Sequence, residues 1–212
     1  LAAMVVVVYI AYFVAAIWYW TEPVPSRSEI PPDLNLDYRE VSFSSTDDVQ
    51  LVGWYFPPQN NTIVILLHGY HSNRQSILSH AEYLVQAGYG VLLYDMRGHG
   101  ESGGRFRSGG WADVDDVAAA VAFLASEEGN RYEHIAVFGF SVGGQVALRA
   151  AAQISAIDAV IADGPGIINN LDAPEPTNAY EVALYVGEVI VNKGTEWRTG
   201  VAEPTAVIKE IG

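Results

Sequence analysis

The chain has 212 residues, which is enough for one domain with a sizeable core and a short additional segment. Its 25 acidic and 11 basic residues give a formal charge of −14, and no basic cluster occurs. This composition argues against nucleic acid and anionic membrane surfaces as partners, because both need clustered cations. The sequence contains no cysteine, so disulfides, thiolate nucleophiles and cysteine-bound zinc are excluded within these residues.

The first twenty residues, Leu1–Trp20, carry no charged side chain. At about 1.5 Å per residue, a helix of this length spans roughly the 30 Å hydrocarbon core of a bilayer. The closing Trp-Tyr-Trp suits a membrane interface, and Pro23 then ends the helix. We therefore predict a transmembrane helix over residues 1–21, a single-pass N-terminal anchor whose orientation in the membrane stays open. A cleaved signal peptide and a buried core helix are the alternatives.

The rest of the chain divides into a proline-rich spacer over residues 22–35 and a folded core over residues 36–212. Apolar and β-prone runs predict strands at 41–44, 51–56, 62–67, 90–94, 135–138 and 157–162, of which the first two form a hairpin. Helical apolar spacing separates the later strands, around residues 77–85, 113–124 and 142–150. This alternation predicts an α/β fold with a mostly parallel sheet flanked by helices.

One decapeptide carries most of the chemical information. Residues 135–144 read I-A-V-F-G-F-S-V-G-G, an apolar run that breaks into the pattern G-x-S-x-G around Ser141. A strand that turns into a helix through one strained residue exposes the side chain of that residue, and flanking glycines leave room for the turn. The pattern therefore predicts a nucleophile elbow with Ser141 at its tip. The alternative is an ordinary serine at a helix N-terminus.

Polar residues follow four of the predicted strands at their carboxyl ends. They are His68-Gly69-Tyr70, Asp95–Gly100, Ser141 and Asp163-Gly164-Pro165. Because the loops at the carboxyl ends of parallel strands build the ligand site of such sheets, we expect these four loops to converge on one pocket.

Three motifs together resemble the α/β-hydrolase superfamily: H-G-Y at 68–70, D-M-R-G-H-G-E-S-G-G at 95–104 and G-F-S-V-G-G at 139–144. The resemblance covers most of residues 40–165, and the chain looks like membrane-anchored members with an esterase-like or prolyl-oligopeptidase-like core. It implies that Ser141 is the nucleophile, activated by a histidine that an acid orients. It also implies an oxyanion hole made by the backbone N–H groups of Tyr70 and Val142, and a reaction without a metal or organic cofactor.

The other polar residues of these motifs are expected to shape loops near the nucleophile. His68 and Gly69 would form the oxyanion loop, with His68 acting through hydrogen bonds rather than as the catalytic base. Asp95 would order the loop that follows it through charge-assisted bonds, and His99 would organise the same loop through bonds to the backbone. His68 and His71 make no convincing metal pair, since they lie in a turn without a third ligand.

The catalytic triad is incomplete in this sequence. All five histidines precede Ser141, whereas in the superfamily the acid and the histidine follow the nucleophile. Asp163 is an alternative acid, as in some lipases; otherwise Asp163-Gly164-Pro165 is a turn. Residues 205–212 resemble the stretch that leads to the acid-bearing strand, so we expect a fragment that ends before two further strands. Residues 165–203 suit either a cap over the site or a crossover helix.

These observations predict a membrane-anchored serine hydrolase that acts on esters, thioesters or amides through an acyl-Ser141 intermediate. Esterase or lipase-like activity on a small-molecule or lipid ester is the first expectation, with little turnover by residues 1–212 alone. The alternative is a hydrolase-fold protein without catalysis, a membrane-tethered binding or scaffolding domain that kept the elbow.

Overall fold

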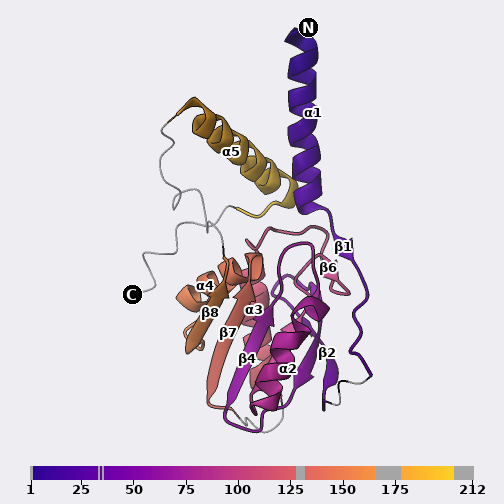
Figure 1. The fold of residues 1–212 in the computed structure, drawn as a ribbon, viewed down its shortest axis with the longest axis vertical. Coiled ribbons are helices and arrows are strands. Elements are labelled where there is room, and N and C mark those ends of the chain that lie inside the picture. Colours follow the sequence, from indigo (N-terminus) through magenta and orange to yellow (C-terminus); the bar gives the residue numbers. More distant parts are fainter. Residues whose placement is uncertain (1, 33, 35, 128–131, 166–177, 203–212) are drawn as a thin grey trace.

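The computed structural model describes residues 2–32, 34, 36–127, 132–165 and 178–202. Its centre is a six-stranded sheet in the order β2-β3-β5-β4-β7-β8 (Figure 1). The strands are β2 Arg39–Ser44, β3 Gln50–Phe56, β4 Thr62–Leu67, β5 Gly90–Tyr94, β7 His134–Phe140 and β8 Ala159–Asp163. The β2–β3 and β3–β5 pairs are antiparallel, and all other neighbours are parallel. The predicted α/β architecture, the hairpin and the six predicted strands are confirmed, with bounds that differ by at most two residues.

Helices cover both faces of the sheet because its central strands are apolar throughout. The helices are α2 Leu78–Gln86, α3 Asp113–Ser126 and α4 Val142–Gln153, and the 3-10 turn Arg74–Ile77 precedes α2. Leu66 and Leu93 belong to the core cluster under α2, whereas Ile65 and Val137 belong to the cluster under α3 and α4. Successive side chains of a strand point to opposite faces, so adjacent residues join different clusters. Burial on both faces is typical of parallel strands.

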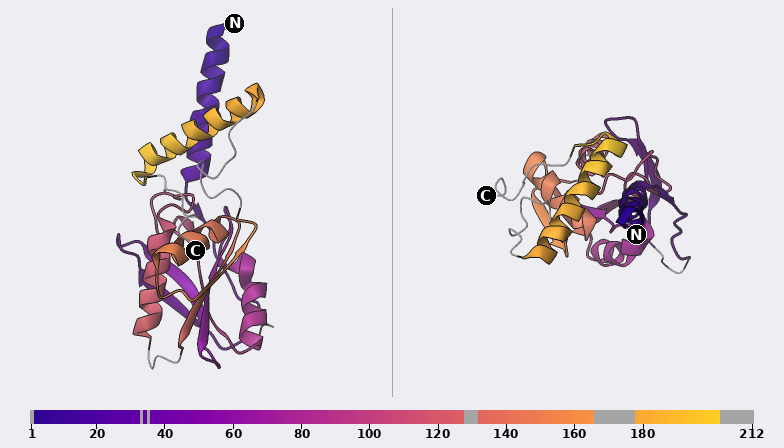
Figure 2. Two further views of the ribbon diagram at one scale, coloured as in Figure 1. Left: turned by 90° about the vertical axis from the view of Figure 1, so that its left-hand side faces the viewer. Right: turned by 90° about the horizontal axis from the view of Figure 1, so that it is seen from above.

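Two long helices lie beyond the carboxyl ends of the strands (Figures 1 and 2). α1, Ala2–Thr21, projects away from the core, and α5, Ala179–Thr199, packs beside it. α5 begins at Asn178, whose side chain accepts the Glu181 N–H, and ends at Gly200 in the left-handed conformation. By length and composition alone, α1 qualifies as a candidate membrane span.

Two glycines let α5 approach α1 closely. Gly187 and Gly194 are seven residues apart and therefore share one side of the helix. A Cβ on Gly187 would lie 3.5 Å from the Phe13 ring, and a Cβ on Gly194 would collide with the side chain of Ile17. Small residues at such a seam allow two helix backbones to come near each other.

The segment 22–35, expected as a spacer, lies partly against the core. Val24–Pro25 forms the short strand β1, which pairs in parallel with β6, His99–Gly100, of the loop after β5. The side chains of Ile30 and Leu34 pack on the core cluster under α2, as does Leu36 at the expected start of the core. These contacts place the end of α1 close to the loops at the carboxyl edge of the sheet.

β8 is the outer strand of the described sheet, and its side chains are less buried than those of the central strands. Ile161 is 58% exposed, and Phe140 of the neighbouring strand is 46% exposed. Residues 205–212, expected to lead into a further strand, lie outside the described residues. The same holds for 166–177 of the candidate cap.

Candidate active site

Ser141 stands between β7 and α4 in a backbone conformation that few residues adopt. Its φ is 54° and its ψ is −118°, outside the helical and extended regions. The Ser141 N–H donates to the Asp163 carbonyl at 2.8 Å, and the Ser141 carbonyl accepts the Gly144 N–H at 2.9 Å. Such strain in a non-glycine residue persists only where the surroundings enforce it, and it gathers at functional sites. The chain therefore holds Ser141 at the tip of a strand–turn–helix junction.

Gly139 and Gly143 make this junction possible. A Cβ on Gly139 would collide with the carbonyl of Gly143. A Cβ on Gly143 would lie 2.5 Å from the Leu67 carbonyl oxygen and 2.7 Å from that of His68. Because the opposing atoms are backbone, no side chain can move aside to relieve these contacts. The G-x-S-x-G pattern thus reflects the packing of the turn on itself and on the end of β4.

The loop His68–Tyr70 lies directly against this junction. A Cβ on Gly69 would be 3.0 Å from the Phe140 ring and 3.6 Å from the Ser141 Cβ. Within the described part of the chain, the N–H groups of Tyr70 and Val142 donate to no backbone carbonyl. Tyr70, Ser141 and Val142 line one cavity. The structure thus brings together Ser141 and the backbone of Tyr70 and Val142, the residues that the sequence analysis named as candidate nucleophile and candidate oxyanion-hole donors.

His68 is fully buried and uses both ring nitrogens. Nδ1 donates to the Gly69 carbonyl at 2.7 Å, and Nε2 accepts the Met96 N–H at 2.9 Å. One donating and one accepting nitrogen define the neutral ring. Burial lowers the pKa of His68 to about 4. The ring therefore links two loops and has no free nitrogen with which to take a proton from a nucleophile.

Asp95 and His99 organise the loop after β5. The buried Asp95 carboxylate accepts the N–H groups of Arg74 at 2.7 Å and of Glu101 at 2.8 Å, and it pairs with the Arg74 guanidinium. Burial raises the pKa of Asp95 against the opposing effect of these donors. His99 Nδ1 donates to the Arg97 carbonyl at 3.0 Å, and burial lowers the pKa of His99 to about 3. The sequence analysis did not identify Arg74, because an isolated arginine gives no indication of its partners.

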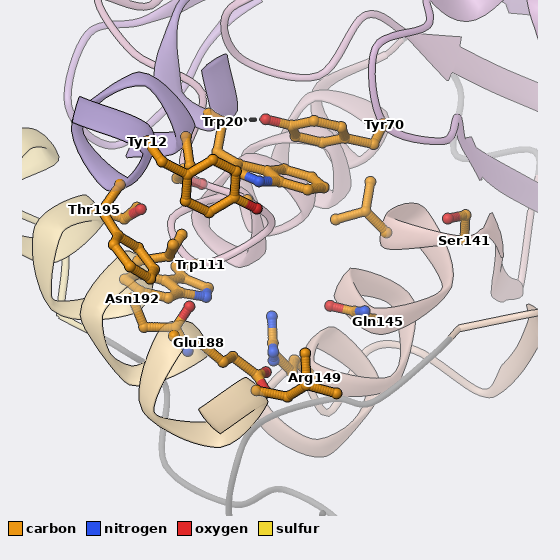
Figure 3. Close-up of a pocket in the computed structure, with 18 of the residues that line it drawn as sticks. Tyr12, Trp20, Tyr70, Trp111, Ser141, Gln145, Arg149, Glu188, Asn192 and Thr195 are labelled. Carbon is orange, nitrogen blue, oxygen red and sulfur yellow. Dashed lines mark hydrogen bonds between the residues drawn. The ribbon is translucent and has the colours of Figure 1, made fainter. Parts of the chain in front are cut away.

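A cavity of about 660 Å³ lies beside Ser141, between the core and the two long helices (Figure 3). We call α1 and α5 the helical cover. The wall from α1 consists of Tyr9, Tyr12, Phe13, Ala16 and Trp20. Gln145 and Arg149 of α4 and Glu188 of α5 contribute polar groups on another side of the cavity. The candidate span therefore forms part of the chamber that contains Ser141, which the sequence did not reveal.

The last turn of α1 is fastened to the oxyanion loop. The Tyr70 hydroxyl donates to the Trp20 carbonyl, and the two rings lie 4.5 Å apart between centroids. The buried Arg107 donates to the carbonyls of Tyr19 and Glu22. Its guanidinium also lies over the Tyr70 ring, 4.4 Å from the centroid. Carbonyls at the C-terminal end of α1, which a helix leaves unsatisfied, are thereby bonded.

None of the five histidines donates to or accepts from Ser141 Oγ, although all of them lie among the described residues. His80 of α2 lies against the Phe138 ring, and His134 begins β7 at the end of the strand remote from Ser141. Asp163 is exposed, and it meets the elbow through its carbonyl rather than its carboxylate. The described residues therefore include a candidate nucleophile and candidate N–H donors, but no histidine hydrogen-bonded to Ser141.

Residues 58–204 match the model of the family described as serine aminopeptidase, S33. The chain belongs to this family. The S33 family model and the solved structures with similar folds confirm the predicted α/β-hydrolase superfamily and support a hydrolase function.

An esterase of Pyrococcus furiosus has a similar structure, with a TM-score of 0.66 and 28% identity over 89% of this chain and 72% of that chain. The S33 chain is also 32% identical to the thiohydrolase aneE of Aspergillus aculeatus, over 54% of this chain and 37% of the relative. Its identity to the polyketide transferase grgF of a Penicillium species is 32%, over 64% of this chain and 47% of the relative. The chain thus spans less than half the length of these curated relatives.

Proposed function

We propose that the protein is a serine hydrolase of carboxylic esters or thioesters, with amides as a further substrate class. Ser141 Oγ attacks the substrate carbonyl carbon while a base removes the hydroxyl proton. The alcohol, thiol or amine then leaves with a proton, and an acyl-serine remains. Water attacks this intermediate, which releases the acid and restores the Ser141 hydroxyl.

The strained backbone of Ser141 is the observation that carries this proposal. A serine at a helix N-terminus normally has an extended φ and caps the helix, but Ser141 has a φ of 54° and makes no side-chain cap bond. Two glycines with no room for a Cβ maintain this conformation. A fold that retains such strain and opens the residue to a 660 Å³ cavity suits a nucleophile.

The N–H groups of Tyr70 and Val142 are proposed to bind the oxyanion. Val142 is the first residue of α4, where N–H groups have no partner within the helix and the helix dipole favours negative charge. His68 and Gly69 support the opposite donor by fixing the loop that bears Tyr70. Asp95 and His99 fix the neighbouring loop, and none of these four residues takes a covalent part.

The base and the acid of the triad are to be sought outside the described residues. His68 and His99 are buried with pKa values of about 4 and 3, so both are neutral at neutral pH, and neither is hydrogen-bonded to Ser141. Asp163 remains a second candidate for the acid, because its backbone already contacts the elbow. An Asp163→Asn variant that keeps full turnover would eliminate it.

We further propose that α1 anchors the enzyme in a membrane as a single-pass helix. The helix has no charged residue, and most of its side chains are exposed to the surroundings. Its Trp18, Tyr19 and Trp20 lie at the end nearest the core, where a bilayer interface would be. The side of the membrane on which the hydrolase domain lies is left open.

Hydrolysis of a short ester such as p-nitrophenyl butyrate by the full-length protein tests the catalytic proposal. Ser141→Ala should lower kcat about 10³-fold or more, as nucleophile removal does in serine hydrolases. Ser155→Ala, an exposed serine just beyond the other end of α4, is the matched control and should keep full activity. Equal turnover by Ser141→Ala and the unmutated protein would instead favour a non-catalytic, membrane-tethered binding domain.

A further inference from the structure

The structure points to a substrate class for this site. We propose that the cavity takes the acyl chain of a membrane lipid ester, which enters from the bilayer alongside α1 and beneath α5. This inference rests on the proposed function, because it presumes that the ester carbonyl reaches Ser141. It goes further by assigning the acyl pocket to the helix that would anchor the protein.

The cavity wall from α1 has the shape and chemistry of an acyl-chain site. Tyr9, Tyr12, Phe13 and Ala16 recur at spacings of three and four residues and so form one stripe along the helix. From Tyr9 to Trp20 the stripe extends about 16 Å along the helix axis at 1.5 Å per residue. Tyr70 and Ser141 lie at the core end of the same cavity (Figure 3). A straight apolar chain laid along this stripe therefore ends at the nucleophile.

The opposite wall suits the polar part of an ester lipid. Gln145 of α4 and Glu188 and Asn192 of α5 line the cavity next to the apolar Leu184 and Val191, whereas α1 contributes mainly aromatic and aliphatic surface. Ligand sites commonly combine an apolar lining with a few placed polar groups that orient the ligand. The cavity thus offers separate environments to an acyl chain and to a polar leaving group.

The outer face of α5 fits the surface of a bilayer. Val186, Ile190, Lys193 and Trp197 are exposed and recur at helical spacing, and Trp197 is 85% exposed. A single lysine in an apolar stripe with tryptophan is typical of helices that lie in a membrane interface. The stripe lies on the side of α5 opposite the residues that line the cavity, such as Glu188 and Asn192, and beside the seam with α1.

The contacts of α5 with α1 place α5 at the depth in a bilayer at which interfacial helices lie. Arg198 lies 3.6 Å from the centroid of the Trp18 ring, at the aromatic end of α1. Gly187 meets Phe13, five residues and about 8 Å further along α1. With Trp18 at the interface, the N-terminal half of α5 enters the acyl boundary by a depth typical of interfacial helices. Figure 2 shows α5 crossing beside α1 above the core.

A series of p-nitrophenyl esters with acyl chains from two to sixteen carbons tests the acyl pocket in the full-length protein. Each buried methylene should raise kcat/KM about fourfold until the cavity is filled. Ala16→Trp fills the part of the cavity next to α1. It should lower, at least tenfold, the ratio of kcat/KM for a long-chain ester to kcat/KM for the acetate ester. The control Ala15→Trp, an exposed neighbour on α1, should leave this ratio unchanged. Ala16→Leu provides the same test if the larger residue prevents folding.

The outcomes separate the two proposals. Turnover of acetate by Ser141 without a dependence on chain length, or equal ratios in the Ala15 and Ala16 variants, would overturn the acyl pocket and leave the hydrolase intact. Absence of Ser141-dependent turnover on every ester would overturn the proposed function itself.

A second arm distinguishes a bilayer lipid from a soluble long-chain ester or acyl thioester. The full-length protein is assayed on phosphatidylcholine vesicles containing a fluorogenic long-chain monoacyl ester, and on the same ester in detergent micelles. The double substitution Ile190→Glu and Trp197→Glu should lower the vesicle-to-micelle rate ratio about tenfold or more. An unchanged ratio would overturn entry from the bilayer.

Discussion

The two sides of the Ser141 cavity are held in different ways. On the core side, Gly139 and Gly143 pack the elbow against backbone atoms, and buried hydrogen bonds fix the loops at 68–70 and 95–102. The helical cover is attached mainly by side chains: Phe13 and Ile17 of α1 against the glycine seam of α5, the Arg107 guanidinium and the Tyr70 hydroxyl, with one backbone bond from the Arg107 N–H to the Thr21 carbonyl. The fold thus fixes the elbow itself through backbone packing and leaves more of the chamber above it to side-chain contacts.

This difference means that core-side changes should cost stability, whereas changes in the cover should cost little stability and act on substrate choice. The largest effect is expected at the buried Arg74–Asp95 pair. Asp95→Asn should lower the free energy of unfolding by about 3 kcal/mol, because it leaves the buried Arg74 guanidinium with the partly exposed Glu101 as its remaining charge partner. Glu127→Gln breaks the exposed pair with Arg39 and should change the free energy of unfolding by less than about 1 kcal/mol. Similar losses in urea unfolding experiments would remove the distinction between buried and exposed pairs.

The burial of Asp113, at the start of α3, should make the stability of the protein depend on pH. Burial and the neighbouring Asp116 raise the pKa of Asp113 to about 7, from 3.8. The stability that its protonated form contributes is therefore present below about pH 4 and is lost as the pH rises through 7. Asp113→Asn avoids this loss, so its stability relative to the unmutated protein should increase by about 3 kcal/mol between pH 5 and pH 8. A difference that stays constant across this range in urea titrations would contradict a buried, protonated carboxyl group.

The elbow glycine Gly143 should tolerate a side chain less well than the seam glycine Gly187 does. Gly143→Ala places a Cβ 2.5 Å from the Leu67 carbonyl oxygen, and we expect a loss of about 1–3 kcal/mol from the resulting overpacking. Gly187→Ala meets Phe13 at an ordinary 3.5 Å, and it should be neutral or slightly stabilising because alanine favours helix. Thermal unfolding of both variants decides the point; equal shifts in Tm would show that the backbone at the elbow can relax.

The smallest effect is expected where the cover meets the oxyanion loop. Tyr70→Phe removes the hydroxyl that donates to the Trp20 carbonyl but keeps the ring and the backbone N–H. The free energy of unfolding of the variant should be lower by about 0.5–1.5 kcal/mol, the net contribution of one hydrogen bond. Tyr83→Phe, on the exposed face of α2, should lose nothing measurable in the same unfolding assay. A larger loss for Tyr70→Phe than for Gly143→Ala would reverse the proposed order of the two sides.

The sequence predicted the core side well because its information is local. The runs at 62–67 and 90–94 are continuous and apolar, and the structure places strands at the same bounds. The G-x-S-x-G pattern located the elbow because backbone collisions leave only glycine at 139 and 143. A steric requirement of this kind restricts the residue type at a position, so it can be recognised in the sequence.

The helical cover could not be predicted in the same way. The aromatic residues at the end of α1 were interpreted as a membrane interface, and nothing in their spacing revealed that Trp20 would meet Tyr70 fifty residues later. Arg74 gave no signal because a buried arginine is recognised only through partners distant in sequence. The segment 22–35 was expected to be a spacer because it is rich in proline. This composition gave no indication that Ile30 and Leu34 pack on the core.

Covalent capture of Ser141 tests the central claim most directly. The full-length protein is treated with a fluorophosphonate carrying a long alkyl chain, and the modified peptide is identified by mass spectrometry. We predict one adduct on Ser141, absent in Ser141→Ala and retained in Ser155→Ala. No adduct, or an adduct that survives Ser141→Ala, would contradict the assignment of Ser141 as the nucleophile.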